Sequence, residues 1–461
     1  MAGTPYLVDS NVLLRWAKPD DRDYPLVVSA IDATLQRGAV FCYTSQNVAE
    51  FWNTCTRPLD RNGYGLSPRG SRNLLMLLLA AAMLVTLPDG LVHAQTFTTL
   101  YTFTGGADGG LPSGGLILDG QGNLYGSTRE LQFSFGTVFE FSPALGMLNT
   151  LYTFQGKGDG SDPNASLSFD GAGNLYGTTF GSDSGYYGTV FELSPNGSGG
   201  WQKTTLLQFD GLDGLHPTSG LVIDGTGNVY GTTLYGGPGN WGIVFELSPG
   251  ASGWTETILH HFGGVFRLQG GLVFDPQGNL YGTANGGGPS GCGGVFELTP
   301  SSGNWNVQVL HAFRCGSDGA NPEGTLAFDS MGRIFGTTNQ GGAFKQGEVY
   351  MLTPRVSKGW QIRVIHSFNG ADGAFPTAGV TLDAAGNIYG ATLNGGVKSV
   401  GVVYKLTATS STSWTHSILH TFTGPDGADP SALLLDSAGD LFGTTVEGGA
   451  GNLGTVFEIT P

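Results

Sequence analysis

The segment GNLYGTT at Gly173–Thr179 occurs seven times along the chain in closely similar forms. The six variants are GNLYGST, GNVYGTT, GNLYGTA, GRIFGTT, GNIYGAT and GDLFGTT, which begin at Gly122, Gly227, Gly278, Gly332, Gly386 and Gly439. The copies recur with a period of about 53 residues. A period of this length, with several extended segments per unit, is typical of a β-propeller, in which four-stranded blades surround an axis.

The repeat over residues 167–209 shows what each unit contributes. LSFD reads as a short first strand, and DGAG at Asp170–Gly173 is a turn sequence whose Gly takes the left-handed backbone conformation. NLYGTT, TVFELSP and WQKTTLLQF read as three further strands. The glycine after the Tyr is expected to let the neighbouring blade approach closely. The sequence therefore predicts an all-β, seven-bladed propeller of four-stranded blades.

The order of strand types predicts how the ring closes. The repeat region begins with FTTLYTF at 97–103, which resembles a fourth strand, and ends with GTVFEIT at 454–460, which resembles a third strand. The first of these segments can complete the last blade beside the second, which would leave no open sheet edge. We therefore expect residues 95–461 to form one closed propeller.

The segment 69–94 has the features of a secretory signal peptide. Arg69 and Arg72 precede an apolar run from Leu74 to Leu87, and VHA stands directly before Gln95. This layout of a basic flank, a short apolar run and small residues is read by signal peptidase. The run is shorter than the 20 or so residues that span a bilayer, so no stable transmembrane span is expected. A buried core helix is the alternative interpretation. We expect a secreted or cell-envelope protein.

Residues 1–68 have a different character and read as strand, helix, strand, helix. The motifs VDSNVLLR, which contains Asp9, and NVAEFWN, which contains Glu50, resemble the first half of a PIN domain. That resemblance implies a Mg²⁺-dependent ribonuclease, in which clustered carboxylates hold the ion. The family completes its site with acids from a second half, and the resemblance stops near residue 68. We interpret the segment as a non-functional fragment with two vestigial metal-site acids.

Composition excludes two classes of protein for the repeat region. The chain has 461 residues, of which 79 are Gly, and its net charge is −16. Aromatic residues make up 11% and charged residues 12%, whereas a disordered chain is poor in the former and rich in the latter. A nucleic-acid-binding surface needs clustered Lys and Arg, so no nucleic-acid partner is expected. The charge suits a surface that meets cations or neutral polymers.

Cysteine, histidine and tryptophan positions are the next candidates. Folding the third and fourth strands of one repeat as a hairpin brings Cys292 opposite Cys315, which predicts a disulfide in a secreted protein, with two free thiols as the alternative. Four histidines share one repeat position but lie on outer strands of different blades, so metal binding by their convergence is not expected. Tryptophans open the fourth strands; we interpret them as packing residues, with sugar stacking as the alternative. The histidines are His260, His311, His366 and His420, and the tryptophans are Trp201, Trp254, Trp305, Trp360 and Trp414.

Asp-Gly loops between the fourth strand of one repeat and the first strand of the next place six carboxylates on one face. These are Asp108, Asp159, Asp213, Asp318, Asp372 and Asp426, and the loop is missing around GGVFRLQGG. Carboxylates are ligands for Ca²⁺, but Asp-Gly is also an ordinary turn pair. Ca²⁺ therefore remains an alternative, no cofactor is expected, and this face is the predicted binding surface.

The repeats, written as GNLYGTT…GG…GTVFEL, resemble the GloVer (Gloeo/Verruco) tandem-repeat family over about residues 97–461. The resemblance implies a β-propeller-like array outside the cytoplasm and supplies no catalytic residues. We expect a monomeric, non-catalytic binding or scaffold module for an extracellular polysaccharide or protein. A propeller lyase or hydrolase acting on an extracellular polymer is the first alternative, and a PIN-type ribonuclease is the second.

Overall fold

The computed structural model describes residues 5–7, 40–42, 95–129, 131, 134–181, 187–264, 266–355 and 359–460. The chain divides into two compact units, Met1–His93 and Ala94–Pro461. In the first unit, β1 (Pro5–Leu7) pairs in parallel with β2 (Val40–Cys42). The two PIN-like acids, Asp9 and Glu50, and the segment 69–94 lie outside the described residues.

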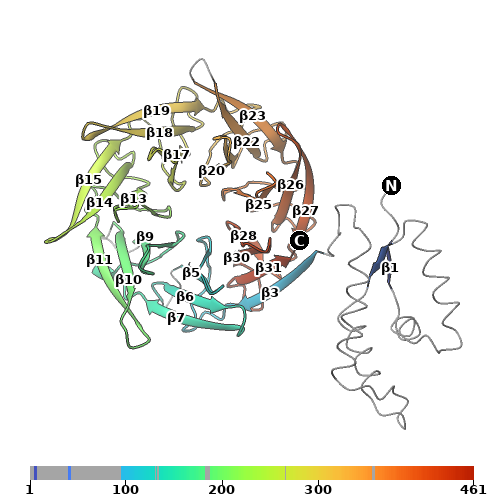
Figure 1. The fold of residues 1–461 in the computed structure, drawn as a ribbon, viewed down its shortest axis with the longest axis horizontal. Coiled ribbons are helices and arrows are strands. Elements are labelled where there is room, and N and C mark those ends of the chain that lie inside the picture. Colours follow the sequence, from blue (N-terminus) through green and yellow to red (C-terminus); the bar gives the residue numbers. More distant parts are fainter. Residues whose placement is uncertain are drawn as a thin grey trace, which may run out of the picture. The chain divides into compact units, whose positions relative to one another are not determined.

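The second unit is a seven-bladed β-propeller of antiparallel sheets, and in six of the blades the strands follow chain order from the axis outward (Figure 1). The first blade contains β4 (Ile117–Leu118), β5 (Leu124–Thr128), β6 (Thr137–Ser142) and β7 (Met147–Thr153). The second contains β8 (Ser168–Phe169), β9 (Leu175–Thr179), β10 (Thr189–Pro195) and β11 (Trp201–Gln208). The third contains β12 (Val222–Ile223), β13 (Val229–Thr232), β14 (Ile243–Gly250) and β15 (Gly253–His261).

The next three blades repeat this plan. The fourth contains β16 (Val273–Phe274), β17 (Leu280–Ala284), β18 (Gly294–Ser301) and β19 (Asn304–Ala312). The fifth contains β20 (Ala327–Phe328), β21 (Ile334–Thr338), β22 (Glu348–Pro354) and β23 (Trp360–Ser367). The sixth contains β24 (Thr381–Leu382), β25 (Ile388–Thr392), β26 (Val402–Ser410) and β27 (Ser413–Thr421). A short 3-10 helix, Lys157–Asp159, lies between the first two blades.

The seventh blade joins the two ends of the propeller. It contains β28 (Ala428–Pro430), β29 (Leu434–Leu435), β30 (Leu441–Glu447) and β31 (Thr455–Thr460), and β3 (Thr96–Thr102) is its outermost strand. β3 runs antiparallel to β31, with Thr96 opposite Thr460 and Thr102 opposite Thr455. The ring is therefore closed by backbone hydrogen bonds between distant parts of the chain.

The glycine in the middle of the repeated word is required by packing inside its own blade. A Cβ on Gly177 would lie 2.5 Å from Phe191 Cζ and 2.8 Å from Leu167 Cδ2. Both neighbours belong to the second blade, so the expectation that this glycine admits the neighbouring blade was wrong. It makes room for the Phe of TVFEL on the adjacent third strand. The first glycine of the word does take the left-handed conformation, with φ 87° at Gly173.

The hydrophobic core lies between blades rather than within them. Each buried cluster combines second- and third-strand residues of two consecutive blades, as in the cluster that joins Tyr230 and Val244 of the third blade to Leu280 and Phe296 of the fourth. The tryptophans belong to this packing, because Trp305 meets the Tyr230 ring edge-on at 6.2 Å between centroids. The interpretation of these tryptophans as packing residues is confirmed. Within the described ranges, no helix has the length and apolar character needed to cross a membrane.

Candidate ligand-binding face

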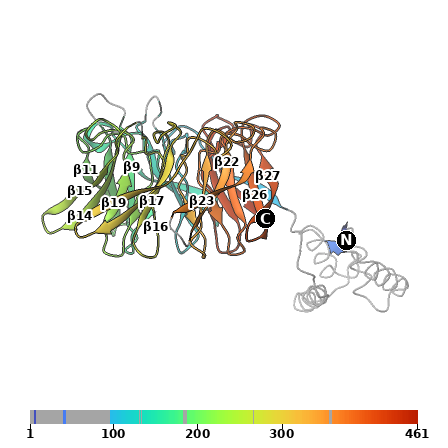
Figure 2. The ribbon, with the colours of Figure 1, turned by 90° about the horizontal axis from the view of Figure 1, so that it is seen from above.

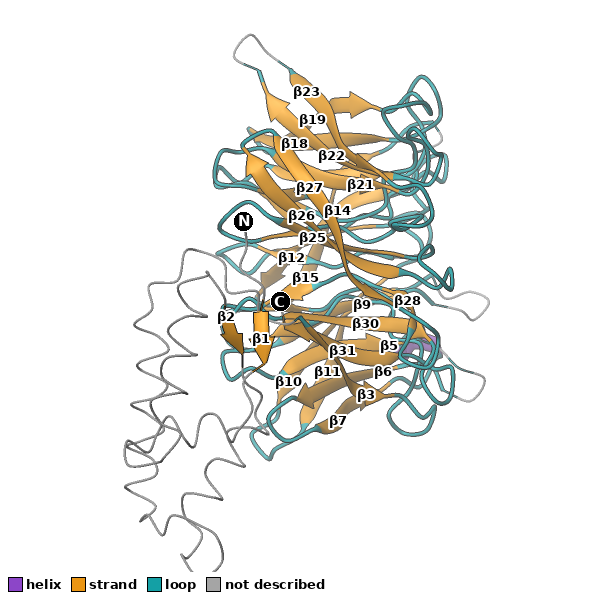
Figure 3. Cartoon of the chain, turned by 90° about the vertical axis from the view of Figure 1, so that its right-hand side faces the viewer, coloured by secondary structure: helices purple, strands orange, loops and turns teal. Residues whose placement is uncertain are grey.

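The propeller has two faces, on which the described connections between strands lie (Figures 2 and 3). One face carries the turns between first and second strands and those between third and fourth strands, and we call it the turn face. The other carries the loops between second and third strands and the loops that lead from one blade to the next. We call it the loop face.

The turn face is held by one hydrogen-bond pattern that recurs from blade to blade. In the second blade, Asp170 Oδ1 accepts hydrogen bonds from the backbone N–H groups of Ala172 (2.8 Å) and Asn174 (2.9 Å). Its Oδ2 accepts from Asn174 Nδ2 and from the Tyr176 hydroxyl. Burial alone would raise the pKa of Asp170, but these hydrogen bonds hold it below its usual value. The carboxylates of this face are therefore occupied by the fold itself.

The loop face carries a recurring backbone strain. In six blades the residue before the loop proline has a left-handed backbone, although none of the six is glycine. The left-handed conformation costs an ordinary L-residue roughly 1–2 kcal/mol, so it persists only where surrounding contacts impose it. The six residues are Leu111, Asp162, His216, Asn321, Phe375 and Asp429, with φ between 55° and 57°.

Hydrogen bonds from two blades impose this conformation. The backbone N–H of His216 donates to the Tyr187 carbonyl of the preceding blade at 2.8 Å, and its own carbonyl accepts from the N–H of Leu234 at 3.1 Å. Leu234 follows the second strand of the next blade. Because both bonds use only the backbone, the side chains at these paired positions are free to differ between blades. Strained positions of this kind concentrate at functional sites.

The side chains at these positions do differ, and from the first blade to the fifth they make a row of inter-blade contacts. Arg129 Nε lies 3.1 Å from Asp162 Oδ1. The Phe180 ring stacks on His216 with centroids 4.1 Å apart and planes 6° apart, and His216 Nδ1 is 2.9 Å from the Phe180 carbonyl oxygen. The row thus passes from an ion pair to an aromatic stack.

The row continues with a cation–π contact and then with amides. Arg267 Cζ lies 5.7 Å from the centroid of the Tyr235 ring. Asn285 Nδ2 donates to the side-chain oxygens of Gln269 and Glu323. We call the ten residues from Arg129 to Asn339 that make these contacts the contact row. They are Arg129, Asp162, Phe180, His216, Tyr235, Arg267, Gln269, Asn285, Glu323 and Asn339.

The amide end of the contact row surrounds a carboxyl group. Asn339 Nδ2 donates to Glu323 Oε2 at 3.0 Å, so the amides of two blades hold both oxygens of Glu323. Burial raises the pKa of Glu323, and the hydrogen bond from Asn339 opposes that shift. Together, this cluster and the stack of Phe180 on His216 place hydrogen-bonding groups and an aromatic surface on the same face.

Large apolar side chains are also exposed on the loop face. Leu212, Phe344 and Val397 lie in loops of this face, and 78%, 57% and 88% of their surfaces respectively are exposed. Single exposed apolar residues are ordinary, but three large ones on one face add apolar contact area to that face.

The six loop carboxylates predicted from the sequence lie on this face, one in each of six different loops. In five of them the carboxylate is hydrogen-bonded to a Tyr or His of its own outer strand. The pairs are Asp108 with Tyr101 (3.0 Å), Asp159 with Tyr152 (2.9 Å), Asp318 with His311 (3.2 Å), Asp372 with His366 (3.1 Å) and Asp426 with His420 (2.9 Å). Asp213 instead accepts from the backbone N–H of Asp210 at 2.8 Å.

The four repeated histidines are likewise distributed over four blades. Three of them form the Asp pairs just given, whereas His260, whose blade junction lacks the Asp-Gly loop, packs edge-on against Phe262 at 4.7 Å. The sequence pattern identified the carboxylates and the histidines separately. It did not identify them as partners, because the contact depends on how each loop folds back over its strand.

The predicted disulfide is confirmed. Cys292, before the third strand of the fourth blade, is bonded to Cys315, after its fourth strand, with Cα atoms 5.4 Å apart. The bond links two loops of the loop face. The fourth blade is also the one whose incoming loop lacks the Asp-Gly sequence.

Two further residues on this face could not be found from the repeat word. Lys203 Nζ lies 2.9 Å from Asp159 Oδ1, and His416 stacks on His366 at 4.2 Å. Each stands two residues after the Trp that opens its fourth strand. An alignment of the repeats shows that this position varies, but only the three-dimensional arrangement shows that it faces the preceding blade.

Comparison with known proteins identifies a repeat family and several proteins of similar structure. The Gloeobacter/Verrucomicrobia repeat matches residues 90–269 and 267–461. No curated protein matches the chain. A putative 6-phosphogluconolactonase from Bacteroides uniformis has a similar structure, with a TM-score of 0.48 and 15% identity over 71% of this chain and 88% of that one. A putative glucose dehydrogenase from Thermus thermophilus reaches a TM-score of 0.43 with 15% identity, covering 80% of this chain and 100% of that one.

A luciferin-regenerating enzyme is similar at a TM-score of 0.41, with 12% identity over 80% of this chain and 96% of that one. At such identities and TM-scores these likenesses carry no argument about activity. The family match, in contrast, spans the whole propeller and rests on the repeats themselves. The chain therefore belongs to the Gloeobacter/Verrucomicrobia repeat family.

Proposed function

We propose that the propeller is a non-catalytic binding module that takes an extracellular polysaccharide on its loop face. The observation that carries the proposal is the contact row. Its backbone positions repeat in each blade, while its side chains change from an ion pair to an aromatic stack and then to an amide cluster. A constant frame with varied side chains on loops is the arrangement on which recognition surfaces are built.

The chemistry of the contact row suits a neutral sugar chain. Sugar rings offer hydroxyl groups that donate and accept hydrogen bonds, and they offer C–H faces that stack on aromatic rings. Asn285, Glu323 and Asn339 supply amide and carboxyl partners, and Phe180 with His216 supplies the stacking surface. The net charge of −16 disfavours polyanions as partners.

The innermost strands support binding without catalysis. The two-residue first strands β4, β8, β12, β16, β20, β24 and β29 carry Ile, Leu, Ser, Phe, Val, Ala and Thr, and none of these side chains supplies an acid or base for turnover at neutral pH. A lyase or hydrolase at the axis would need such groups converging there. The disulfide suits an oxidising compartment, which supports the proposal that the module is secreted or belongs to the cell envelope.

The test is retention of the purified full chain in native gels that contain neutral polysaccharides, one polymer per gel. At least one polymer should retard the wild-type chain, and Phe180→Ala should weaken that retardation about tenfold, which corresponds to about 1.4 kcal/mol of stacking. Met331→Ala, which alters an exposed side chain on the turn face, is the matched control and should bind like wild type.

Three outcomes would contradict the proposal. Retardation that Phe180→Ala leaves unchanged would place binding elsewhere on the molecule. New reducing ends or unsaturated products from the bound polymer would show an enzyme. Failure to bind any polymer, together with capture of an extracellular protein that depends on Phe344 or Val397, would show a protein partner instead.

A further inference from the structure

On the loop face, five blade junctions hold a carboxylate paired with a Tyr or His, and every junction has one further outer-strand position, which we call the third participant. It is the outer-strand residue that lies opposite the last apolar residue of the third strand, as His416 lies opposite Leu406. Around the ring its identity changes in every blade. The seven occupants are Leu148, Lys203, Glu256, Val307, Ile362, His416 and Phe97.

This position faces the pair of the preceding blade. Lys203 forms an ion pair with Asp159 at 2.9 Å. Phe97 stacks on His420 with centroids 3.6 Å apart and planes 5° apart. The third participant therefore decides the chemistry of each junction: a cation beside a carboxylate in one, an apolar cover over a His–Asp pair in another.

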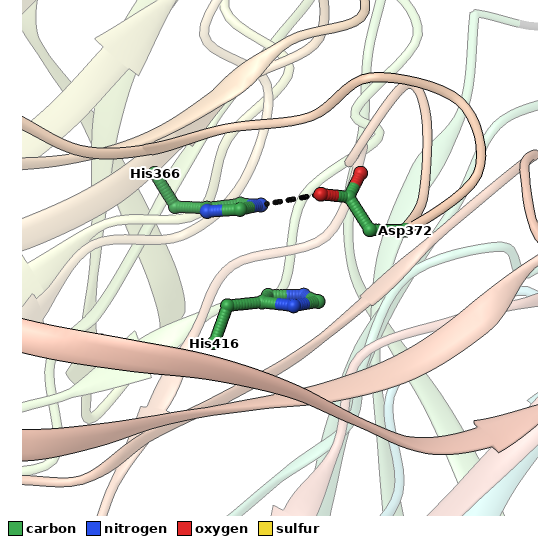
Figure 4. Close-up of side chains that lie close together, drawn as sticks. All are labelled: His366, Asp372 and His416. Atoms are coloured by element: carbon green, nitrogen blue, oxygen red, sulfur yellow. Dashed lines mark hydrogen bonds and ion pairs between the residues drawn. The ribbon is translucent and has the colours of Figure 1, made fainter.

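The junction between the fifth and sixth blades brings three metal-ligating side chains together (Figure 4). His366 Nε2 lies 3.1 Å from Asp372 Oδ2. His416, from β27 of the next blade, stacks on His366 with ring centroids 4.2 Å apart and planes 9° apart. One ligand atom from each of the three residues lies within 4.8 Å of the others.

The groups around these ligands favour a metal. Within the described structure, His416 Nε2 is buried and has no hydrogen-bond partner. A buried imidazole nitrogen without a hydrogen-bond partner in the protein is available to a ligand. Both oxygens of Asp372 accept hydrogen bonds from Asn369, through its backbone N–H at 2.9 Å and its Nδ2 at 3.0 Å, which orients the carboxylate.

The protonation state of the two histidines and the exposure of the ligands to solvent also suit a metal ion. Burial lowers the pKa of His366, and burial together with the nearby His366 lowers the pKa of His416 to about 4. Both imidazoles are therefore neutral at neutral pH, which is the form that binds metals. The His366 and Asp372 side chains are each 18% exposed, so an ion and a water molecule can reach them from the solvent.

We propose that His366, Asp372 and His416 bind one divalent transition-metal ion of the zinc class and so join the fifth and sixth blades. Two imidazoles and one carboxylate form a ligand set that zinc accepts, with a fourth position left for water. Ca²⁺ and Mg²⁺ are less suitable because they prefer all-oxygen ligands.

Binding requires a small rearrangement. Ligands about 2.0–2.2 Å from zinc lie roughly 3.3 Å or a little more from one another in a tetrahedron, and His366 Nε2 and Asp372 Oδ2, which are 3.1 Å apart, need to separate only slightly. The lone pair of an imidazole nitrogen lies in the ring plane, so parallel stacked rings do not aim at one point. The His416 ring must therefore tilt out of the stack to reach the ion.

The junction between the fourth and fifth blades is an internal control. His311 and Asp318 form the same pair 3.2 Å apart, but Ile362 is the third participant there. That junction has two ligands and an apolar cover. The proposal therefore predicts binding at one junction and its absence at the next, although their backbones are equivalent.

The test is titration of the tag-free full chain with Zn²⁺ by calorimetry, with the stoichiometry checked by equilibrium dialysis. The wild-type chain should bind one equivalent. His416→Ile, which copies the neighbouring junction, should weaken this binding at least 100-fold, and Asp372→Asn should also weaken it. His311→Leu, which alters the two-ligand junction, is the matched control and should leave stoichiometry and affinity unchanged.

A gain-of-site variant keeps the test decisive. Ile362→His places a third ligand beside His311 and Asp318 and should raise the stoichiometry to two. Thermal unfolding in the presence of chelator confirms that each variant is folded. Absence of Zn²⁺ binding to the folded wild-type chain, or wild-type affinity in the folded His416→Ile variant, would overturn the proposal.

Discussion

The turn face and the loop face are built from the same seven repeats, but they use their polar side chains differently. On the turn face, Asp170 and its counterparts all bind their own turn, so one hydrogen-bond pattern serves most blades. On the loop face, backbone hydrogen bonds hold the loops, and side chains such as Phe180 and Asn339 are released for other contacts. The comparison separates residues that the fold needs in every blade from residues that vary between blades.

The disulfide should have the largest effect on stability, although it lies on the variable face. Replacing both Cys292 and Cys315 by Ser should lower the free energy of unfolding by about 3 kcal/mol, because the bond closes a loop of 23 residues in the unfolded chain. Urea unfolding with and without reductant measures this loss. Reductant should destabilise the wild-type chain by a similar amount and leave the double variant unchanged. Equal stability of both chains under oxidising conditions would contradict the prediction.

Mutations on the turn face should lower the stability of the protein and leave its polysaccharide binding unchanged. Asp170→Ala removes a carboxylate that accepts four hydrogen bonds and should cost about 2 kcal/mol. Polysaccharide retention should stay at the wild-type value. Gln121→Ala, an exposed turn residue whose hydrogen bond comes from its backbone N–H, is the control and should change neither quantity. A loss of binding in the folded Asp170→Ala variant would break the distinction between the faces.

The loop face should show the opposite response. Asn339→Ala removes a half-buried amide that donates to Glu323 at 3.0 Å, and it should weaken polysaccharide binding about fivefold, close to 1 kcal/mol. The free energy of unfolding should change by less than this, because the backbone hydrogen bonds that hold the loop remain. Retention in native gels and thermal unfolding of the same sample measure the two effects. A variant that loses stability but keeps its affinity would assign Asn339 to the fold.

The smallest predicted effect concerns acid sensitivity, which should differ between the junction that contains His416 and a junction with an apolar residue at the same position. His416 titrates near 6.5 in an unfolded chain, whereas burial and the nearby His366 lower its pKa in the fold to about 4. As pH falls, the unfolded state takes up this proton first. The stabilising contribution is therefore complete above about pH 6.5 and is lost between there and about pH 4.

Partial exposure of His416 reduces the expected loss to about 0.5–1 kcal/mol in metal-free protein. His416→Ile should remove that part of the pH dependence, whereas Val307→Ile at an apolar junction should keep it. Unfolding in urea at a series of pH values gives both slopes. Identical slopes for wild type and His416→Ile would show that this histidine does not titrate differently in the folded state.

Much of the architecture could be predicted from the repeats. A period of about 53 residues, a left-handed glycine in each turn and the order of strand types are local features, and they led to seven four-stranded blades. The packing partner of Gly177 could not be read in this way. Its neighbour Phe191 is brought over it by the register between β9 and β10, which the spacing alone does not specify.

The candidate sites were predictable only in part. The Asp-Gly loops marked the loop face, and the hairpin geometry predicted the bond between Cys292 and Cys315. The contact row has no sequence signature, because its members are linked by contacts between different blades. For the same reason the sequence did not connect His416 with the four repeated histidines, although its ring stacks on one of them, His366.

The pairing of β3 with β31 also has a consequence for how the molecule is made. Synthesis proceeds from the N-terminus, so the outermost strand of the last blade leaves the ribosome first and its partner leaves last. At about 5–20 residues per second, the interval between them is roughly 20–70 s. Throughout that time β3 carries an unpaired edge. The ring can therefore close only after β31 has been synthesised, although its outermost strand was made before all the others in the propeller.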